Sequence, residues 1–195
     1  MSRHLVVDID DLCNQYDPLD TLKAIKDEVP DFKATMFAIP SRCSDKLLKR
    51  YFDEDSWLHL GMHGWTHTRG ECLSWNPDEA HKKIMKGIGM GFEDAFKAPH
   101  WIITPLIYAT CAELKMPIAD HKNYRCVLEN GPPTYTFNDP DLPYKAFHFH
   151  TWDTMANGIA DCKDEFLEYI KVFPAQFKWV SEVATNGTRP IQPTA

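Results

Sequence analysis

Short strand-like segments alternate with helical segments along most of this chain, and that alternation limits the possible fold more than any other feature. Residues 5–9 are rich in β-branched side chains, as in a buried strand, and residues 19–29 carry apolar side chains at helical spacing. Further strands are expected at 33–39, 57–62, 96–99, 116–119, 124–128, 144–149 and 177–183. Further helices are expected at 45–51, 77–90, 104–114 and 164–172. Such alternation predicts a parallel sheet, and roughly seven units predict a distorted, minimal (β/α)7-type barrel in a single α/β domain.

The length and composition fit one folded domain. The chain has 195 residues, of which 44% are hydrophobic and 25% are charged. A chain of this size buries enough apolar surface to fold without disulfides or a structural metal. We assign residues 1–184 to the folded domain and expect residues 185–195, which include two prolines, to form a flexible tail.

The charge balance and the hydropathy exclude several kinds of partner. The formal charge of −7 argues against sequence-independent binding of nucleic acid or of an anionic membrane, because both need a basic surface. No run of 18 apolar residues exists that could span a membrane. The apolar stretch before Asp8 is too short for a signal peptide, so a cytoplasmic location is expected. These features make no prediction about the oligomeric state.

Ionisable side chains follow four of the expected strands. They lie within residues 8–11, 63–67, 97–101 and 148–153. The carboxyl ends of parallel strands meet at one end of a barrel, where the active sites of such barrels are built. We therefore expect these four segments to form one site.

His63 and His67 have a spacing that suits a metal ion. Four residues apart, they lie on one side of a helical turn and can share one ion. Zinc binds imidazole and carboxylate groups, and a catalytic zinc site uses three protein ligands and a water molecule. A carboxylate from the first strand would complete the ligand set, and a second one beside it would act as a base. The alternatives are a chance spacing of two histidines and a solvated turn at the acidic residues.

The motifs and their order resemble those of the polysaccharide deacetylases, the NodB-homology group of carbohydrate esterase family 4. The family motif T-F-D-D-[GS] corresponds to D-I-D-D-L at residues 8–12, and H-[STG]-x-x-H corresponds to H-G-W-T-H at residues 63–67. The R-x-P motif corresponds to K-A-P-H-W at residues 97–101, and L-x-L-x-H to A-F-H-F-H at residues 146–150. Residues 178–182 resemble the last strand of the family. The resemblance covers nearly the whole chain and implies a polysaccharide deacetylase-like catalytic domain at residues 1–184.

The resemblance implies which residues hold the metal. Asp11, His63 and His67 correspond to the family's metal ligands. The expected cofactor is one divalent ion, with zinc as the first choice and cobalt or manganese as alternatives.

It also implies catalytic roles for four residues. Asp10 corresponds to the catalytic base, and Lys97 to the arginine that steers it. His150 corresponds to the general acid, with His148 as the alternative. The implied reaction is hydrolysis of an N-acetyl group on an amino sugar or oligosaccharide.

Five residues beside these motifs are candidates for substrate binding. The backbone amide near His100 is expected to help hold the oxyanion, and the flat faces of tryptophans suit sugar rings. An equal alternative is that the indoles fill the barrel rim. The candidates are Pro99, His100, Trp101, Trp65 and Trp152.

The sequence departs from the family pattern at three places. Leu12 replaces the glycine or serine of the first motif, and Lys97 replaces an arginine without its forked geometry. The fourth motif, an aspartate and a tryptophan that support the acidic histidine, has no clear match, although Asp120 follows an expected strand. Two further functions therefore stay open. One is deformylation or amide hydrolysis on another small sugar- or nucleoside-like substrate, and the other is a catalytically silent sugar-binding module.

Overall fold

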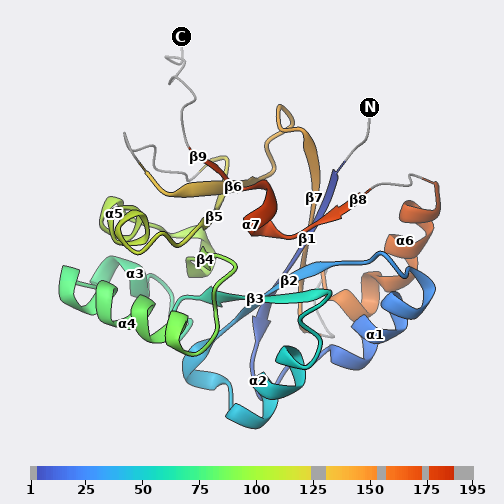
Figure 1. The fold of residues 1–195 in the computed structure, drawn as a ribbon, viewed down its shortest axis with the longest axis horizontal. Helices are drawn as coiled ribbons and strands as arrows, with labels where there is room; N and C mark the ends of the chain where they lie inside the picture. Colours follow the sequence, from blue (N-terminus) through green and yellow to red (C-terminus); the bar gives the residue numbers. More distant parts are fainter. Residues whose placement is uncertain (1–3, 124–130, 153–156, 173–175, 187–195) are drawn as a thin grey trace.

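The centre of the protein is a sheet of mostly parallel strands. The computed structural model describes residues 4–123, 131–152, 157–172 and 176–186 (Figure 1). Within these residues the strand order is β7-β1-β2-β3-β4-β5-β6-β9, β8 pairs with the start of β1, and only β9 is antiparallel to its neighbour. The strands are β1 (His4–Leu12), β2 (Ala34–Ala38), β3 (Leu58–His63), β4 (Phe96–Lys97), β5 (Ile118–His121), β6 (Pro133–Phe137), β7 (Tyr144–His150), β8 (Gln176–Lys178) and β9 (Thr185–Asn186).

Most of the helices lie around the outside of this sheet (Figure 1). The longer ones follow the expected spacing of apolar residues, and α4 begins at a capping box in which Asn76 and Glu79 each accept a hydrogen bond from the other's backbone N–H. The helices are α1 (Leu19–Glu28), α2 (Asp45–Phe52), α3 (Glu71–Ser74), α4 (Pro77–Gly89), α5 (Pro105–Glu113), α6 (Ile159–Val172) and α7 (Val180–Val183), with short 3₁₀ turns η1 (Pro40–Arg42) and η2 (Pro99–Trp101).

Side chains connect β6 and β7, two strands near opposite edges of the sheet that are not paired through their backbones. Tyr144 on β7 places its hydroxyl between the backbone N–H and C=O of Thr136 on β6, at 3.0 and 3.2 Å. The rings of Tyr135 and Tyr144 stack with centroids 5.4 Å apart. The sheet is thus a nearly closed barrel, and the predicted single-domain, distorted (β/α)7-type barrel is confirmed.

Alternation along β1 separates the core from the barrel interior. Every residue of β1 after His4 is buried. Leu5, Val7 and Ile9 belong to the large hydrophobic core shared with the helices. Val6 belongs to a smaller interior cluster with residues of β2, β5 and β6. Because side chains two residues apart share a face, Asp8 and Asp10 continue the interior row toward the carboxyl end of the barrel.

The structure differs from the expected elements in several segments. Residues 133–137 form β6, which the sequence did not predict, and the expected strand at 124–128 lies outside the described residues. The expected strand at 177–183 is wrong beyond Lys178, and the resemblance of 178–182 to a last strand fails with it. Glu182 accepts the N–H of Trp179 three residues earlier, which starts the short helix α7 instead.

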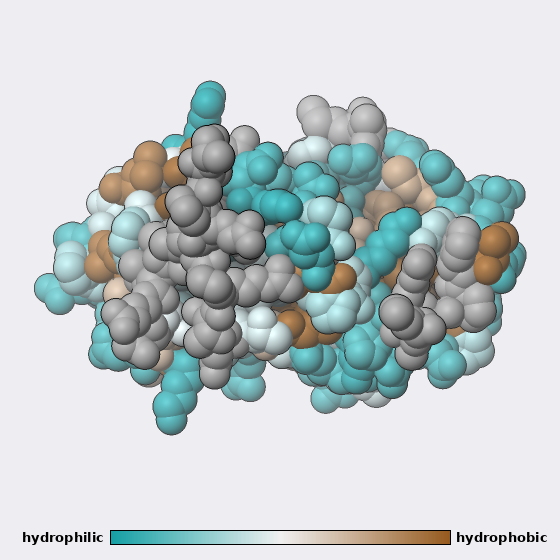
Figure 2. All heavy atoms as spheres, turned by 90° about the horizontal axis from the view of Figure 1, so that it is seen from above, coloured by the Kyte–Doolittle hydropathy of each residue, from teal (hydrophilic) through white to brown (hydrophobic). Residues whose placement is uncertain are grey.

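Two further expectations concern the domain boundary near the C-terminus and the absence of a membrane-spanning helix. Thr185 and Asn186 form β9 against β6, so this strand begins one residue beyond the expected domain boundary at 184, and residues 187–195 lie outside the described part. None of the described helices has the length and apolar character needed to cross a bilayer. Figure 2 shows a face on which hydrophobic side chains occur in small groups between hydrophilic ones.

Candidate metal centre and active site

A bulge at the end of β1 turns two consecutive carboxylates toward the same place. Ile9 pairs with Met36 on β2 while Leu12 pairs with Ala38, so β1 contains one extra residue here. Asp11 takes the left-handed conformation, with φ 74°. The bulge breaks the strand alternation, so both Asp10 and Asp11 reach the histidine at the end of β3.

Asp11, His63 and His67 place three possible metal ligands together. Oδ1 of Asp11 lies 2.9 Å from Nε2 of His67 and 3.5 Å from Nε2 of His63. The three ligand atoms all lie within 4.8 Å of one another. The structure thus brings together the three residues that the sequence predicted as ligands.

The chemistry of this group fits a divalent metal. Nδ1 of His63 lies 3.1 Å from the carbonyl oxygen of Lys97, which as an acceptor fixes the proton on Nδ1 and leaves the lone pair on Nε2. Oδ1 of Asp11 is buried and makes no hydrogen bond among the described residues, although Nε2 of His67 lies 2.9 Å from it. A buried carboxylate oxygen without a hydrogen bond is costly, and a bound cation would satisfy it.

Lys97 is fully buried and lies between two carboxylates. Its Nζ donates hydrogen bonds to Oδ1 of Asp10 at 2.8 Å and to Oδ1 of Asp8 at 2.6 Å. The lysine therefore contacts the candidate base as the resemblance implied. Oδ2 of Asp10 points the other way, 3.5 Å from Nε2 of His63.

Asp8 is a site residue to which the sequence analysis gave no role. Its Oδ1 lies 2.6 Å from Nδ1 of His148, and its Oδ2 accepts a hydrogen bond from the Tyr135 hydroxyl at 2.7 Å. Burial opposes the charged form of Asp8, but the attraction of Lys97 and of His148, with their hydrogen bonds, holds its pKa well below the usual range. The spacing of Asp8 and Asp10 by two residues was the available signal, whereas Tyr135 lies on the strand that was not predicted.

His148 and His150 share the interior face of β7 and flank Asp10. Nε2 of His148 lies 3.8 Å from Oδ2 of Asp10, and His150 is paired with Asp10 in the strand register. A ligand atom from each of the three residues lies within 4.8 Å of the others. Burial lowers the pKa of His150 to about 4, so this imidazole is neutral near pH 7.

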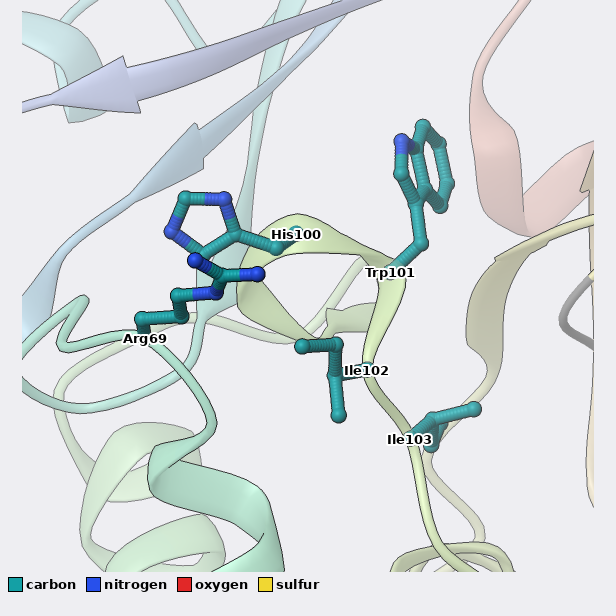
Figure 3. Close-up of a pocket in the computed structure, with 5 residues that line it drawn as sticks. All are labelled: Arg69, His100, Trp101, Ile102 and Ile103. Carbon is teal, nitrogen blue, oxygen red and sulfur yellow. The ribbon is translucent and has the colours of Figure 1, made fainter.

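The segment after β4 forms one wall of a pocket beside Asp11, His63 and His67, which are called the ligand group below. His100 and Trp101 both take the left-handed conformation, with φ 55° and 60°. The His100 ring lies 5.4 Å from the His67 ring. The pocket has a volume of about 480 Å³. Figure 3 shows its lining residues, which are Arg69, His100, Trp101, Ile102 and Ile103.

The three candidate tryptophans lie in different surroundings. The Trp101 ring covers Nζ of Lys97, 4.1 Å from the ring centroid. Trp152 stacks on His150 with centroids 4.1 Å apart. Trp65 packs against the hydrophobic core, and Nζ of Lys86 lies 4.9 Å from its ring centroid. Trp101 and Trp152 therefore adjoin the site. Trp65 contributes its backbone to residues 64–67, the loop that joins the two histidine ligands and is called the ligand loop below.

Two other residues that the sequence analysis named, Pro99 and Asp120, contact the protein framework. Pro99 is buried at the start of η2 and packs close to Gly64, the first residue of the ligand loop. Asp120, at the end of β5, accepts a hydrogen bond from the Tyr108 hydroxyl at 2.6 Å.

Comparisons with known proteins identify the fold. No protein-family model matches the sequence, and no curated protein matches it. A family 4 acetyl xylan esterase from Clostridium thermocellum, in complex with cobalt, superposes with a TM-score of 0.66 at 14% identity, covering 93% of this chain and 90% of the other. The peptidoglycan deacetylase PdaC from Bacillus subtilis gives a TM-score of 0.63 at 17% identity and the same coverages.

A third solved structure of this fold carries a different description. It is a CE4 family pseudoenzyme from Bacillus anthracis, with a TM-score of 0.63 at 13% identity, covering 94% of this chain and 66% of the other. Since such low identity carries the fold and not the activity, the comparisons establish an architecture. The chain has the fold of the family 4 carbohydrate esterases, as its motifs implied.

Proposed function

We propose that this protein belongs to the polysaccharide deacetylases and is a metal-dependent hydrolase that removes an N-acetyl group from an amino sugar or oligosaccharide. The observation that carries the proposal is the group Asp11, His63 and His67 beside a carboxylate, Asp10, that has one oxygen held and the other directed at the group. A divalent metal held by these three ligands supplies the polarisation of a carbonyl oxygen and the activation of a water molecule.

Asp10 is the proposed general base. Lys97 holds Oδ1, so the orientation of Oδ2 toward the ligand group is fixed before substrate binds. Oδ2 takes the proton of the attacking water. The ammonium of Lys97 stabilises the carboxylate between turnovers, as the family's arginine does in the motif that Lys97 replaces.

His148 is the proposed proton donor to the leaving nitrogen. An amine leaves only when it is protonated, so the reaction needs a general acid as well as the base. Nδ1 of His148 lies 2.6 Å from Oδ1 of Asp8, and this contact orients the ring with Nε2 3.8 Å from Oδ2 of Asp10. His150, the residue that the motif implied, is neutral near pH 7 because burial lowers its pKa to about 4.

The substrate binds across the pocket beside His100. This pocket adjoins the ligand group through the contact of the His100 and His67 rings. His100, Trp101 and Trp152 are the proposed contacts of the sugar, and Pro99 shapes the turn that presents them. The proposed substrate is an oligosaccharide or a smaller amino sugar.

A catalytically silent module is the second candidate, since the Bacillus anthracis neighbour is described as a pseudoenzyme and Lys97 here replaces an arginine. Elemental analysis of the purified protein beside His63→Ala separates the two. Roughly one zinc, cobalt or manganese ion per chain, lost in the variant, supports the hydrolase. Release of acetate from N-acetylated oligosaccharides then establishes it. Absence of metal after incubation with all three ions would favour the silent module.

A further inference from the structure

Glu71 makes an unusual set of contacts with the loop between the two histidine ligands. Its Oε1 accepts hydrogen bonds from the backbone N–H of Trp65 at 3.0 Å and of His67 at 2.9 Å. Its Oε2 accepts from the N–H of Thr66 at 3.0 Å and from the Thr66 hydroxyl at 2.9 Å. The side chain is buried. One carboxylate thus satisfies three consecutive N–H groups of residues 65–67.

The loop needs such support because its backbone is left-handed at both ends and is strained at His67. Gly64 has φ 58° and His67 has φ 60°, and the left-handed conformation is unfavourable for a residue with a side chain such as His67. A Cβ at position 64 would lie 2.1 Å from Oε1 of Glu71 and 2.7 Å from Cγ of Pro99. The carboxylate therefore approaches the loop at a place where only glycine leaves room for it.

The strained conformation has a direct consequence for the ligand group. His63 ends β3 and is placed by the sheet, where its partner in β4 is Lys97. His67 is placed by the loop, whose carboxyl end has no strand to fix it. The N–H of His67 donates to Glu71, so the position of the His67 imidazole depends on this carboxylate.

We propose that Glu71 is a positioning residue for the metal centre, which sets the metal affinity by holding the 64–67 loop in its ligand-binding conformation without touching the ion. The inference rests on the proposed function, because it assumes that Asp11, His63 and His67 bind a metal. A carboxylate suits the role because both oxygens accept hydrogen bonds. A glutamine at this position would turn an NH₂ group toward an N–H or a hydroxyl of the loop and would leave backbone donors unsatisfied.

The test measures Co²⁺ binding by the full-length protein, using Glu71→Gln. We expect the dissociation constant for Co²⁺ to rise by roughly tenfold or more, as it does when partners of metal ligands are removed. We also expect the visible absorption spectrum of bound Co²⁺ to change, because the spectrum depends on the placement of the ligands. No substrate is needed for either readout.

The matched control is Asp94→Asn. Asp94 is also a buried carboxylate, which accepts hydrogen bonds from Thr35 and Ser181 near the amino ends of the strands. This variant is expected to lower the melting temperature but to keep the Co²⁺ dissociation constant within about twofold of the wild type, because distant sites act independently.

Three results would overturn the proposal. Wild-type affinity and spectrum in a folded Glu71→Gln protein would do so, as would an equal loss of affinity in Asp94→Asn. An unchanged spectrum with a weaker affinity that high salt cancels would reduce the effect to long-range charge. If the wild type itself binds no Co²⁺, the proposed function fails and takes this inference with it, an outcome distinct from failure in the variant alone.

A second variant keeps the test valid if Glu71→Gln does not fold. Thr66→Val removes the hydroxyl that donates to Oε2 of Glu71 and contacts the exposed Thr68 hydroxyl, and it leaves the backbone contacts in place. With one hydrogen bond to Glu71 lost, the Co²⁺ dissociation constant is expected to rise about fivefold. An unchanged constant in this variant would count against the proposal.

Discussion

Nζ of Lys97 lies 2.8 Å from Oδ1 of Asp10, inside the barrel and away from solvent. The same ammonium donates to Asp8 at 2.6 Å. One buried cation therefore serves two buried carboxylates, and the candidate base is fixed by a residue from the opposite side of the barrel interior. A charge left without a partner in such a place is strongly destabilising.

This arrangement makes Lys97 a residue that the fold itself needs. Replacing it with methionine, which has a similar length, leaves Asp8 and Asp10 without their shared cation. We expect Lys97→Met to lower the free energy of unfolding by about 3–5 kcal/mol, as for other buried pairs that lose one partner. Urea unfolding followed by circular dichroism measures the change.

The control for that experiment is Lys49→Met. Lys49 forms an exposed ion pair with Asp53 on the surface of the protein. Its loss should change the free energy of unfolding by less than about 0.5 kcal/mol. Equal stabilities for the Lys97 and Lys49 variants would mean that the buried network contributes no net stability.

The two neighbouring carboxylates of β1 should separate into two functions. Asp11→Asn is expected to lose the bound divalent ion, because Asp11 supplies the carboxylate oxygen that lies close to both histidine ligands. Asp10→Asn should keep the ion and lose at least about a hundredfold in turnover, because only the base is removed. Metal analysis and a turnover assay on each variant measure both effects. Loss of the metal in Asp10→Asn with retention in Asp11→Asn would show that the roles are exchanged.

The two histidines of β7 should differ in their effect on turnover. We expect His148→Gln to lower kcat by about a hundredfold or more, because the proton donor is lost. His150→Gln should lower kcat less, since its pKa of about 4 leaves it neutral near pH 7. Steady-state kinetics on a substrate that releases acetate compares the two. A larger loss in His150→Gln would return the donor role to the residue that the family motif implies.

Asp8 should make the stability of the protein depend on acid pH. Burial opposes its ionisation, but Lys97 and His148 hold its pKa in the fold well below the ordinary 3.8. The unfolded chain therefore binds a proton at higher pH than the folded one. The stability that Asp8 contributes is complete above the unfolded pKa and is lost as the pH falls through the folded pKa.

Urea unfolding of Asp8→Asn between roughly pH 5 and pH 2 tests this dependence. The free energy of unfolding is expected to decline less with falling pH in the variant than in the wild type. Asp53→Asn, which removes an exposed carboxylate, should keep the wild-type slope. A wild-type slope in Asp8→Asn would place the acid sensitivity in other groups.

Much of the architecture could be predicted because its signals are local. The strand at Leu5–Ile9 follows from β-branched residues, and α4 follows from the Asn76-Pro77 cap. The meeting of residues 8–11, 63–67, 97–101 and 148–152 follows from the parallel sheet, since it places all strand ends at one end of the barrel.

The secondary-structure predictions were wrong in segments whose structure depends on a long-range contact. Pro133–Phe137 begins with a proline and has weak alternation, and it becomes a strand by pairing with β5 and β9. Val180–Val183 has the composition of a strand but forms a helix, because Glu182 caps Trp179 and Thr35 accepts the N–H of Val180. Neither partner is visible in the local pattern.

The sequence by itself determined the barrel and the set of ionisable residues at one end, because periodicity and motif spacing are properties of neighbouring residues. Only the tertiary structure decided how those residues act on one another. The bulge at Asp11, the contact of Asp8 with Tyr135 across 127 residues of sequence, and the support of His67 by Glu71 all depend on packing. A buried charge needs a partner, and that partner can lie far away in the sequence. A local sequence pattern does not show which distant residues the fold brings close together.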